Sequence, residues 1–230
     1  MREIIFDTET TGLDPRSGHR LVEIGCIELV DRRESGRTFH AYFNPERDMP
    51  AEAEAVHGLS IQFLSDKPLF ASCVEDLLEF LGDAPMIAHN AAFDFGFINA
   101  ELARAGRPAL DMARMCCTVQ MARKLHPGAK HSLDALCTRY GIDRSHRIKH
   151  GALLDAELLA HLYIEMTGGR QIGLGLGAAP VAAGSSAMVR VSAPPRPFRE
   201  PRPHAATAAE LARHKEFVAA LTQPLWHDSP

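Results

Sequence analysis

Three stretches within the first 45 residues combine apolar and polar side chains in a pattern that is typical of β-strands, in which successive side chains point to opposite faces. The pattern predicts strands at residues 2–9, 20–30 and 37–45. The polar stretch DRRESGR, residues 31–37, predicts the turn between the second and third strands. The chain is therefore expected to begin with a run of three strands.

Further along the chain the hydrophobic spacing becomes helical. Residues 73–83 have this spacing, and the apolar run 85–90 predicts one more short strand. Thr118 and Ser132 are expected to be helix N-caps. The remaining helices are expected at residues 90–106, 118–126, 132–141 and 152–169. Strands followed by mixed strands and helices predict an α/β fold, with a mixed central sheet flanked by helices.

Composition changes after Gly169. Residues 170–206 are rich in Gly, Ala, Pro and Ser without core periodicity, which predicts a flexible linker. Thr207 and Glu210 match a capping box and predict a helix within residues 207–230. This segment is expected to dock on a partner rather than to be a disordered end. Its expected anchors are Leu211, Val218, Leu221 and Trp226, the only tryptophan of the chain.

The overall composition, 46% hydrophobic and 23% charged in 230 residues, is that of a globular protein. No apolar run is long enough to span a membrane, and no signal-peptide pattern is present, so a cytoplasmic location is expected. Five cysteines without a C-x-x-C pair favour reduced thiols.

The net charge of −4 is unevenly distributed. Residues 170–230 carry seven Lys or Arg and four Asp or Glu, a balance of +3 that leaves the rest of the chain at −7. An acidic folded part argues against broad electrostatic binding of nucleic acid. It is compatible with an enzyme that holds the end of a strand through metal ions.

Four carboxylates occupy unusual positions. Asp7 and Glu9 lie on the same face of the first strand. Asp94 stands between two phenylalanines in a helix, and Asp155 shares a helical face with three leucines. Solvation or helix capping would explain some of them singly, but a buried carboxylate needs a partner. Two divalent cations held by all four acids would supply it, in the arrangement used for phosphoryl transfer.

His150 lies five residues before Asp155, just ahead of the predicted helix. An imidazole beside a metal site can take the proton from an attacking water at neutral pH. Most of the 12 histidines must be structural or exposed, and His150 is singled out by its position relative to Asp155.

Three segments, FDTETTG, HNAAFDFGF and HGALLD, resemble the three motifs of the DEDDh group of 3′→5′ exonucleases. The stretches SLDALCTRYGI and VHGLS add to a resemblance that covers residues 3–169, and it is strongest to proofreading members associated with bacterial replicative polymerases. The resemblance implies a ribonuclease H-like fold for residues 1–169. It implies that Asp7, Glu9, Asp94 and Asp155 bind two divalent cations, Mg²⁺ or Mn²⁺, and that His150 is the general base.

The resemblance also implies contacts to substrate and partners. Besides the metal-binding acids, Glu52 and His57 fall where family members contact the terminal nucleotide, although a turn or a helix cap would explain both equally well. The segment RQIGLGL resembles a sliding-clamp-binding motif, against the alternative of a plain linker. Its anchors would be Gln171, Leu174 and Leu176. The C-terminal segment would bind the polymerase catalytic subunit, and a small accessory subunit is a further possible partner.

The expected function is metal-dependent 3′→5′ exodeoxyribonuclease proofreading on single-stranded or frayed 3′ DNA ends, with release of nucleoside 5′-monophosphates. An RNA-trimming member of the same superfamily is the alternative enzyme, because the metal chemistry ignores the 2′-OH. A structural adaptor between polymerase and clamp is the alternative from another class. The tail favours the proofreading enzyme, since a free-standing RNA trimmer has little use for a linker and a docking helix.

Overall fold

The computed structural model describes residues 1–145, 147, 149–169 and 205–222. The chain divides into two compact units, which are considered separately. The expected clamp-binding anchors Gln171, Leu174 and Leu176, and the expected anchor Trp226, lie outside the described residues.

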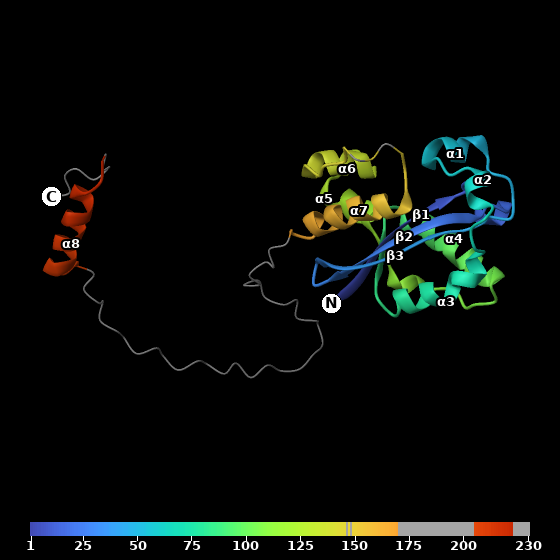
Figure 1. The fold of residues 1–230 in the computed structure, drawn as a ribbon, viewed down its shortest axis with the longest axis horizontal. Coiled ribbons are helices and arrows are strands. Elements are labelled where there is room, and N and C mark those ends of the chain that lie inside the picture. Colours follow the sequence, from blue (N-terminus) through green and yellow to red (C-terminus); the bar gives the residue numbers. More distant parts are fainter. Residues whose placement is uncertain (146, 148, 170–204, 223–230) are drawn as a thin grey trace, which may run out of the picture. The chain divides into compact units, whose positions relative to one another are not determined.

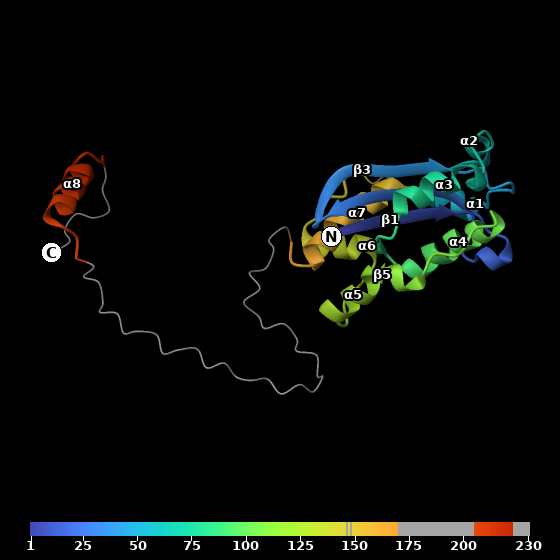
Figure 2. The same cartoon turned by 90° about the horizontal axis from the view of Figure 1, so that it is seen from below.

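The larger unit is built on a five-stranded sheet with the order β3-β2-β1-β4-β5. Its strands are β1 (Arg2–Thr10), β2 (Leu21–Val30), β3 (Arg33–Tyr42), β4 (Met86–Ala88) and β5 (Met115–Cys117). The first three are antiparallel, and their long ribbons run side by side in Figure 2. β4 is parallel to both β1 and β5, so the sheet is mixed as predicted.

Helices cover both faces of this sheet (Figure 1). They are α1 (Ala51–His57), α2 (Ile61–Leu64), α3 (Phe70–Leu81), α4 (Ala91–Arg104), α5 (Thr118–Leu125), α6 (Leu133–Tyr140) and α7 (Ala152–Met166). One hydrophobic cluster joins the sheet to α3 and α4, and a second joins it to α5, α6 and α7. The chain therefore has the predicted α/β architecture, with two buried layers.

The alternation along β1 separates these two layers. Ile4 and Phe6 are fully buried in the cluster on the α3–α4 side. Ile5 is fully buried on the α7 side. Side chains two residues apart share a face, so Asp7 and Glu9 continue the α7 side toward the end of the strand. Because β1 and β4 are parallel, this end lies beside the loop that leads from β4 into α4.

The predicted turn at residues 31–37 is wrong in length. The hairpin turns at Asp31 and Arg32 alone, with φ of 51° and 62°, and β3 begins at Arg33. Two consecutive residues with positive φ are typical of the tight turn that matches the twist of a β-hairpin. Residues 33–38 lie on an edge strand and are exposed, so they carry no hydrophobic alternation.

The predicted N-caps have different outcomes. The Ser132 hydroxyl accepts a hydrogen bond from the Ala135 amide at 3.3 Å, as a capping residue does. Thr118 is not an N-cap: α5 is preceded by Cys117, and the Thr118 hydroxyl instead donates to the Ala88 carbonyl at 3.3 Å. Thr118 is fully buried there, so its hydroxyl ties α5 to the end of β4.

The smaller unit contains α8 (Ala208–Ala219). Thr207 and Glu210 form the predicted capping box, each side chain bonding the other residue's backbone. The side chains of Leu211, Phe217 and Leu221 are exposed. Within the described parts of the chain, no helix is both long and apolar enough to cross a membrane.

Candidate active site

The four acids singled out in the sequence meet in one cavity of about 280 Å³. Asp7 and Glu9 reach it from β1, Asp94 from the first turn of α4 and Asp155 from the first turn of α7. His150 lines the same cavity from the loop before α7. Side chains from the end of one strand and the starts of two helices thus converge as the sequence predicted.

Asp94 is only 2% exposed, so it is not a solvent-facing residue. The Thr8 hydroxyl donates a hydrogen bond to its Oδ1 atom at 2.6 Å. Thr8 lies on the face of β1 that also carries Phe6, and this contact links α4 to β1 at the edge of the cavity. The bond holds the Asp94 carboxylate beside the other acids.

Burial and mutual repulsion perturb the acids strongly. Burial, together with the charges of Asp155 and Glu23, raises the pKa of Glu9 to about 8. Burial and the neighbouring Asp94 and Glu9 raise the pKa of Asp7 well above its ordinary value. Burial raises the pKa of Asp94 to about 7, although the hydrogen bond from Thr8 acts in the opposite direction. A buried cluster of mutually repelling acids is typical of a site that binds a cation.

The donor set fits a hard divalent cation. One ligand atom each of Glu9, His150 and Asp155 lies within 4.8 Å of the other two. Asp7 and Asp94 add further carboxylate oxygens at the same cavity. Carboxylate oxygens are the ligands that Mg²⁺ and Mn²⁺ prefer, and a bound cation would offset the repulsion among the acids.

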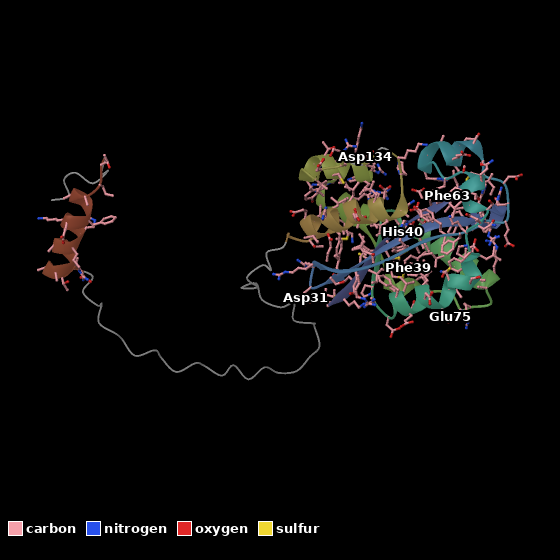
Figure 3. The ribbon with its side chains drawn as sticks, in the orientation of Figure 1. Asp31, Phe39, His40, Phe63, Glu75 and Asp134 are labelled. Atoms are coloured by element: carbon pink, nitrogen blue, oxygen red, sulfur yellow. The ribbon has the colours of Figure 1, made fainter. Side chains whose placement is uncertain are left out.

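Asp155 has a cationic partner that the sequence analysis did not identify. Arg147 Nε and Nη2 donate to the two carboxylate oxygens of Asp155 at 2.5 and 2.6 Å. A third nitrogen, Nη1, donates to Asp134 on α6 at 2.8 Å, and Figure 3 labels Asp134. The signal for Arg147 was the buried Asp155 itself, which required a positive group nearby.

His150 is positioned by hydrogen bonds from Arg147 to its ring and from its own backbone amide to Val56. Its Nδ1 lies 2.6 Å from Arg147 Nη2 and 3.2 Å from Asp155 Oδ2. Its backbone amide donates to the Val56 carbonyl at the end of α1, at 3.3 Å. Because arginine can only donate, the shorter contact requires that Nδ1 accepts, so the 3.2 Å approach of Nδ1 to Asp155 Oδ2 is not a hydrogen bond.

A second cavity of about 630 Å³ adjoins the acids and shares Glu9, Thr8 and Phe93 with the first. Glu52 and His57 line it from α1, a helix that the sequence analysis did not predict. The His57 Nδ1 accepts the Leu59 amide at 3.0 Å, and burial lowers the His57 pKa. Its buried Nε2 has no hydrogen bond of good geometry among the described residues.

Apolar side chains complete the rim of this second cavity. Leu13 is 84% exposed and Val56 is 49% exposed, and both line it together with Phe93. Leu13 and Val56 were not predicted from the sequence, because exposed apolar residues in a loop and a short helix give no periodic signal. An apolar rim next to a polar floor suits a ligand with a flat ring and a charged group.

Comparison with known proteins identifies the family. The sequence model described as Exonuclease matches residues 4–163. The chain belongs to this exonuclease family. The DNA polymerase III subunit epsilon of Rickettsia felis is 48% identical over 224 residues, which cover 96% of this chain and 97% of that protein. The subunit epsilon of Escherichia coli K12 is 44% identical over 176 residues, 74% of this chain and 72% of that protein.

Solved structures agree with this family in fold. Exonuclease X in complex with 5′ overhanging duplex DNA is 26% identical, with a TM-score of 0.55 over 71% of this chain and 90% of that one. The nuclease domain of 3′hExo, a DEDDh family member bound to rAMP, has a TM-score of 0.63 and 17% identity, over 72% of this chain and 91% of that one. The chain therefore has the expected ribonuclease H-like fold. Its family and its relatives make it a 3′→5′ exonuclease.

Proposed function

We propose that this chain is the proofreading subunit of a replicative DNA polymerase, which removes nucleotides from single-stranded or frayed 3′ DNA ends as nucleoside 5′-monophosphates. The observation that carries the proposal is the cavity in which Asp7, Glu9, Asp94, Asp155 and His150 meet. Relatives that match nearly the whole chain are subunits epsilon of DNA polymerase III, which supports the role in replication.

The reaction would depend on divalent cations held by the four acids, two ions of Mg²⁺ or Mn²⁺. Bound there, the cations would stabilise the negative charge of the phosphate and lower the pKa of the attacking water. His150 would take the proton of that water, because its ring lies at the edge of the acid cluster. Asp94 would be oriented by Thr8 throughout.

The second cavity would hold the terminal nucleoside. Leu13, Val56 and Phe93 offer apolar surface to the base. His57 Nε2 is a buried donor whose hydrogen bond a bound nucleotide would complete. Glu52, at the start of the same helix, would accept a hydrogen bond from the sugar. A paired end would have to unstack before its last nucleotide entered, which favours mismatched ends.

The tail would join the nuclease to its partners. The exposed side chains of Leu211 and Leu221, with half-buried Val218, give α8 an apolar stripe that the polymerase catalytic subunit would cover. Gln171, Leu174 and Leu176 would bind a sliding clamp, and a small accessory subunit would bind the nuclease unit. Tethering of this kind gives an acidic nuclease a high effective concentration at the primer end.

The test is digestion of matched 5′-labelled DNA and RNA single strands by the full chain with Mg²⁺. Stepwise shortening from the 3′ end, faster on DNA and lost in EDTA, is the expected result. Asp155→Asn should lower the rate by at least about a hundredfold, because the variant removes a charge that the cations need. Faster digestion of RNA would move the assignment to an RNA-trimming enzyme.

Glu157→Gln is the matched control, since Glu157 lies on the same helix two residues away but is exposed. This variant should retain the wild-type rate. If Asp155→Asn also retained metal-dependent digestion, the assignment of the acids would be wrong. If no strand were digested although the protein bound polymerase, the adaptor function would remain.

A further inference from the structure

Arg147 is the most enclosed cation at the acid cluster. Its side chain is 9% exposed, and the nitrogens of its guanidinium contact two different carboxylates. Nε and Nη2 face Asp155, whereas Nη1 faces Asp134 on α6. A bidentate pair with a carboxylate that is 4% exposed in its side chain is a strong contact, because the surroundings exclude water.

This contact uses the groups that catalysis needs. Both oxygens of Asp155 accept from Arg147, and these are the oxygens that would coordinate a cation. The Nδ1 atom of His150 accepts from the same Nη2, so the lone pair that would take a proton is engaged as well. The Arg147 guanidinium therefore binds both the carboxylate that would coordinate the metal and the imidazole that would act as the base.

A neighbouring cavity offers space into which the Arg147 guanidinium can move. A smaller cavity of about 230 Å³ lies beside the acid cavity and shares Asp134, Arg147 and His150 with it. Asp134 is 47% exposed and already holds Nη1, and it also pairs with Arg144 at 3.0 Å. A swing about the Nη1–Asp134 contact would keep one ion pair while it released Asp155 and His150.

We propose that Arg147 is the internal counter-cation of the site: it holds Asp155 and His150 in place before metal binding, and divalent cations displace it toward Asp134. The proposal rests on the metal site proposed above. Arg147 is a positioning residue, which acts through Asp155 and His150. Its charge keeps the cluster assembled without a metal, at the cost of competing with the metal for the same oxygens.

The test is a calorimetric titration of the full chain with MgCl₂, with wild type and variants compared at the same pH of about 8.5. Arg147→Ala should bind Mg²⁺ more tightly, by about three- to tenfold, because the competitor is gone. The melting temperature of this variant in EDTA should fall below that of the wild type. Mg²⁺ should raise the melting temperature of the variant by more than it raises that of the wild type. Loss of a purely structural residue would not strengthen metal binding.

Arg144→Ala is the matched control, because Arg144 shares Asp134 with Arg147 and has no contact with Asp155 among those described. It should bind Mg²⁺ with wild-type affinity. Should Arg147→Ala prove unfolded in EDTA, Arg147→Lys decides, since lysine keeps the charge but cannot span both oxygens and should give a smaller gain.

If the variant that folds bound Mg²⁺ with the same affinity as the wild type or more weakly, the proposed displacement of Arg147 by the metal would be wrong. If the wild type bound no Mg²⁺ at all, the metal site of the proposed function would fail first, and the exchange with it. The two failures are distinct, because the first is seen in the wild type alone.

Discussion

Gly25 of β2 lies directly under Leu153 of α7: a Cβ atom at position 25 would come within 2.3 Å of the Leu153 backbone nitrogen. Gly25 pairs with Asp7 across the β1–β2 ladder. The absence of a side chain therefore lets the first turn of α7 rest on the sheet beside Asp7. Asp155, in that same turn, reaches the other acids because of this close approach.

Gly25→Ala should displace the start of α7, because the contact is with backbone that cannot rotate away. We expect a loss of about 1–3 kcal/mol in the free energy of unfolding, together with a large fall in exonuclease rate. Urea unfolding and digestion of a labelled strand measure the two effects. Gly96→Ala is the control, since Gly96 is exposed in α4 and a Cβ there would meet no atom of the described part of the chain within 4 Å, so the variant should be neutral or stabilising. Wild-type activity in Gly25→Ala would contradict the argument.

Gly58 follows His57 of the second cavity and lies against Lys149, the residue before His150. It has φ of +78°, and the side chain of Lys149 packs against it, so that a Cβ atom at position 58 would come within 2.7 Å of the Lys149 Cδ atom. These Lys149 atoms belong to the far end of a flexible side chain that can rotate away, so Gly58→Ala should keep a near wild-type rate constant of cleavage and show only a backbone cost of about 1–2 kcal/mol in the free energy of unfolding. Gly36→Ala has a similar φ of +84°, with no atom of the described residues within 4 Å of a Cβ there, and it should show the same backbone cost. A markedly slower rate in Gly58→Ala alone would show that the Lys149 side chain is fixed beside His150.

The parts of the fold that could be predicted from the sequence are those with strong periodicity. β1 has alternating buried residues on both faces, and α7 carries a broad apolar surface, so both appeared in the pattern at the right positions. The acids were found because a carboxylate in such a surface contradicts the pattern around it. The burial of Asp94 and Asp155 confirms this reasoning.

Other features leave no such pattern. α1 is a short helix whose residues are mostly exposed, and its functional position depends on the fold rather than on local sequence. Arg147 lies in an irregular polar loop among other basic residues, so only the three-dimensional arrangement selects it as the partner of Asp155. Asp31 and Arg32 form the hairpin turn without the glycine that would have marked it.

The raised pKa of Glu9 predicts how stability depends on pH in EDTA. The folded protein keeps a proton on Glu9 up to about pH 8, whereas an unfolded glutamate loses it near 4.5. Between these values the folded state binds more protons, so this group lowers stability as pH rises. Glu9→Gln should therefore stabilise the protein in EDTA by more than about 1 kcal/mol at pH 8.5 and by little at pH 4.5.

Urea unfolding at the two pH values, with and without Mg²⁺, measures this effect. Mg²⁺ should stabilise the wild type most at high pH, because cation binding favours the ionised carboxylate, and should stabilise Glu9→Gln less. A pH-independent difference between the variant and the wild type in EDTA would show that Glu9 is not protonated in the folded protein.

Substitutions of Thr8 test how a single hydrogen bond sets the pKa of Asp94. Its hydroxyl donates to Asp94 at 2.6 Å and holds the pKa of Asp94 down against burial. Thr8→Val removes the donor while it preserves the shape, so the Asp94 pKa should rise and the acid limb of the pH–rate profile should move to higher pH. We expect a fall of about tenfold in rate at pH 7, recovered in part at pH 9. Thr8→Ser keeps the hydroxyl and should follow the wild-type profile, whereas an unshifted profile in Thr8→Val would mean that Asp94 does not limit metal binding in this range.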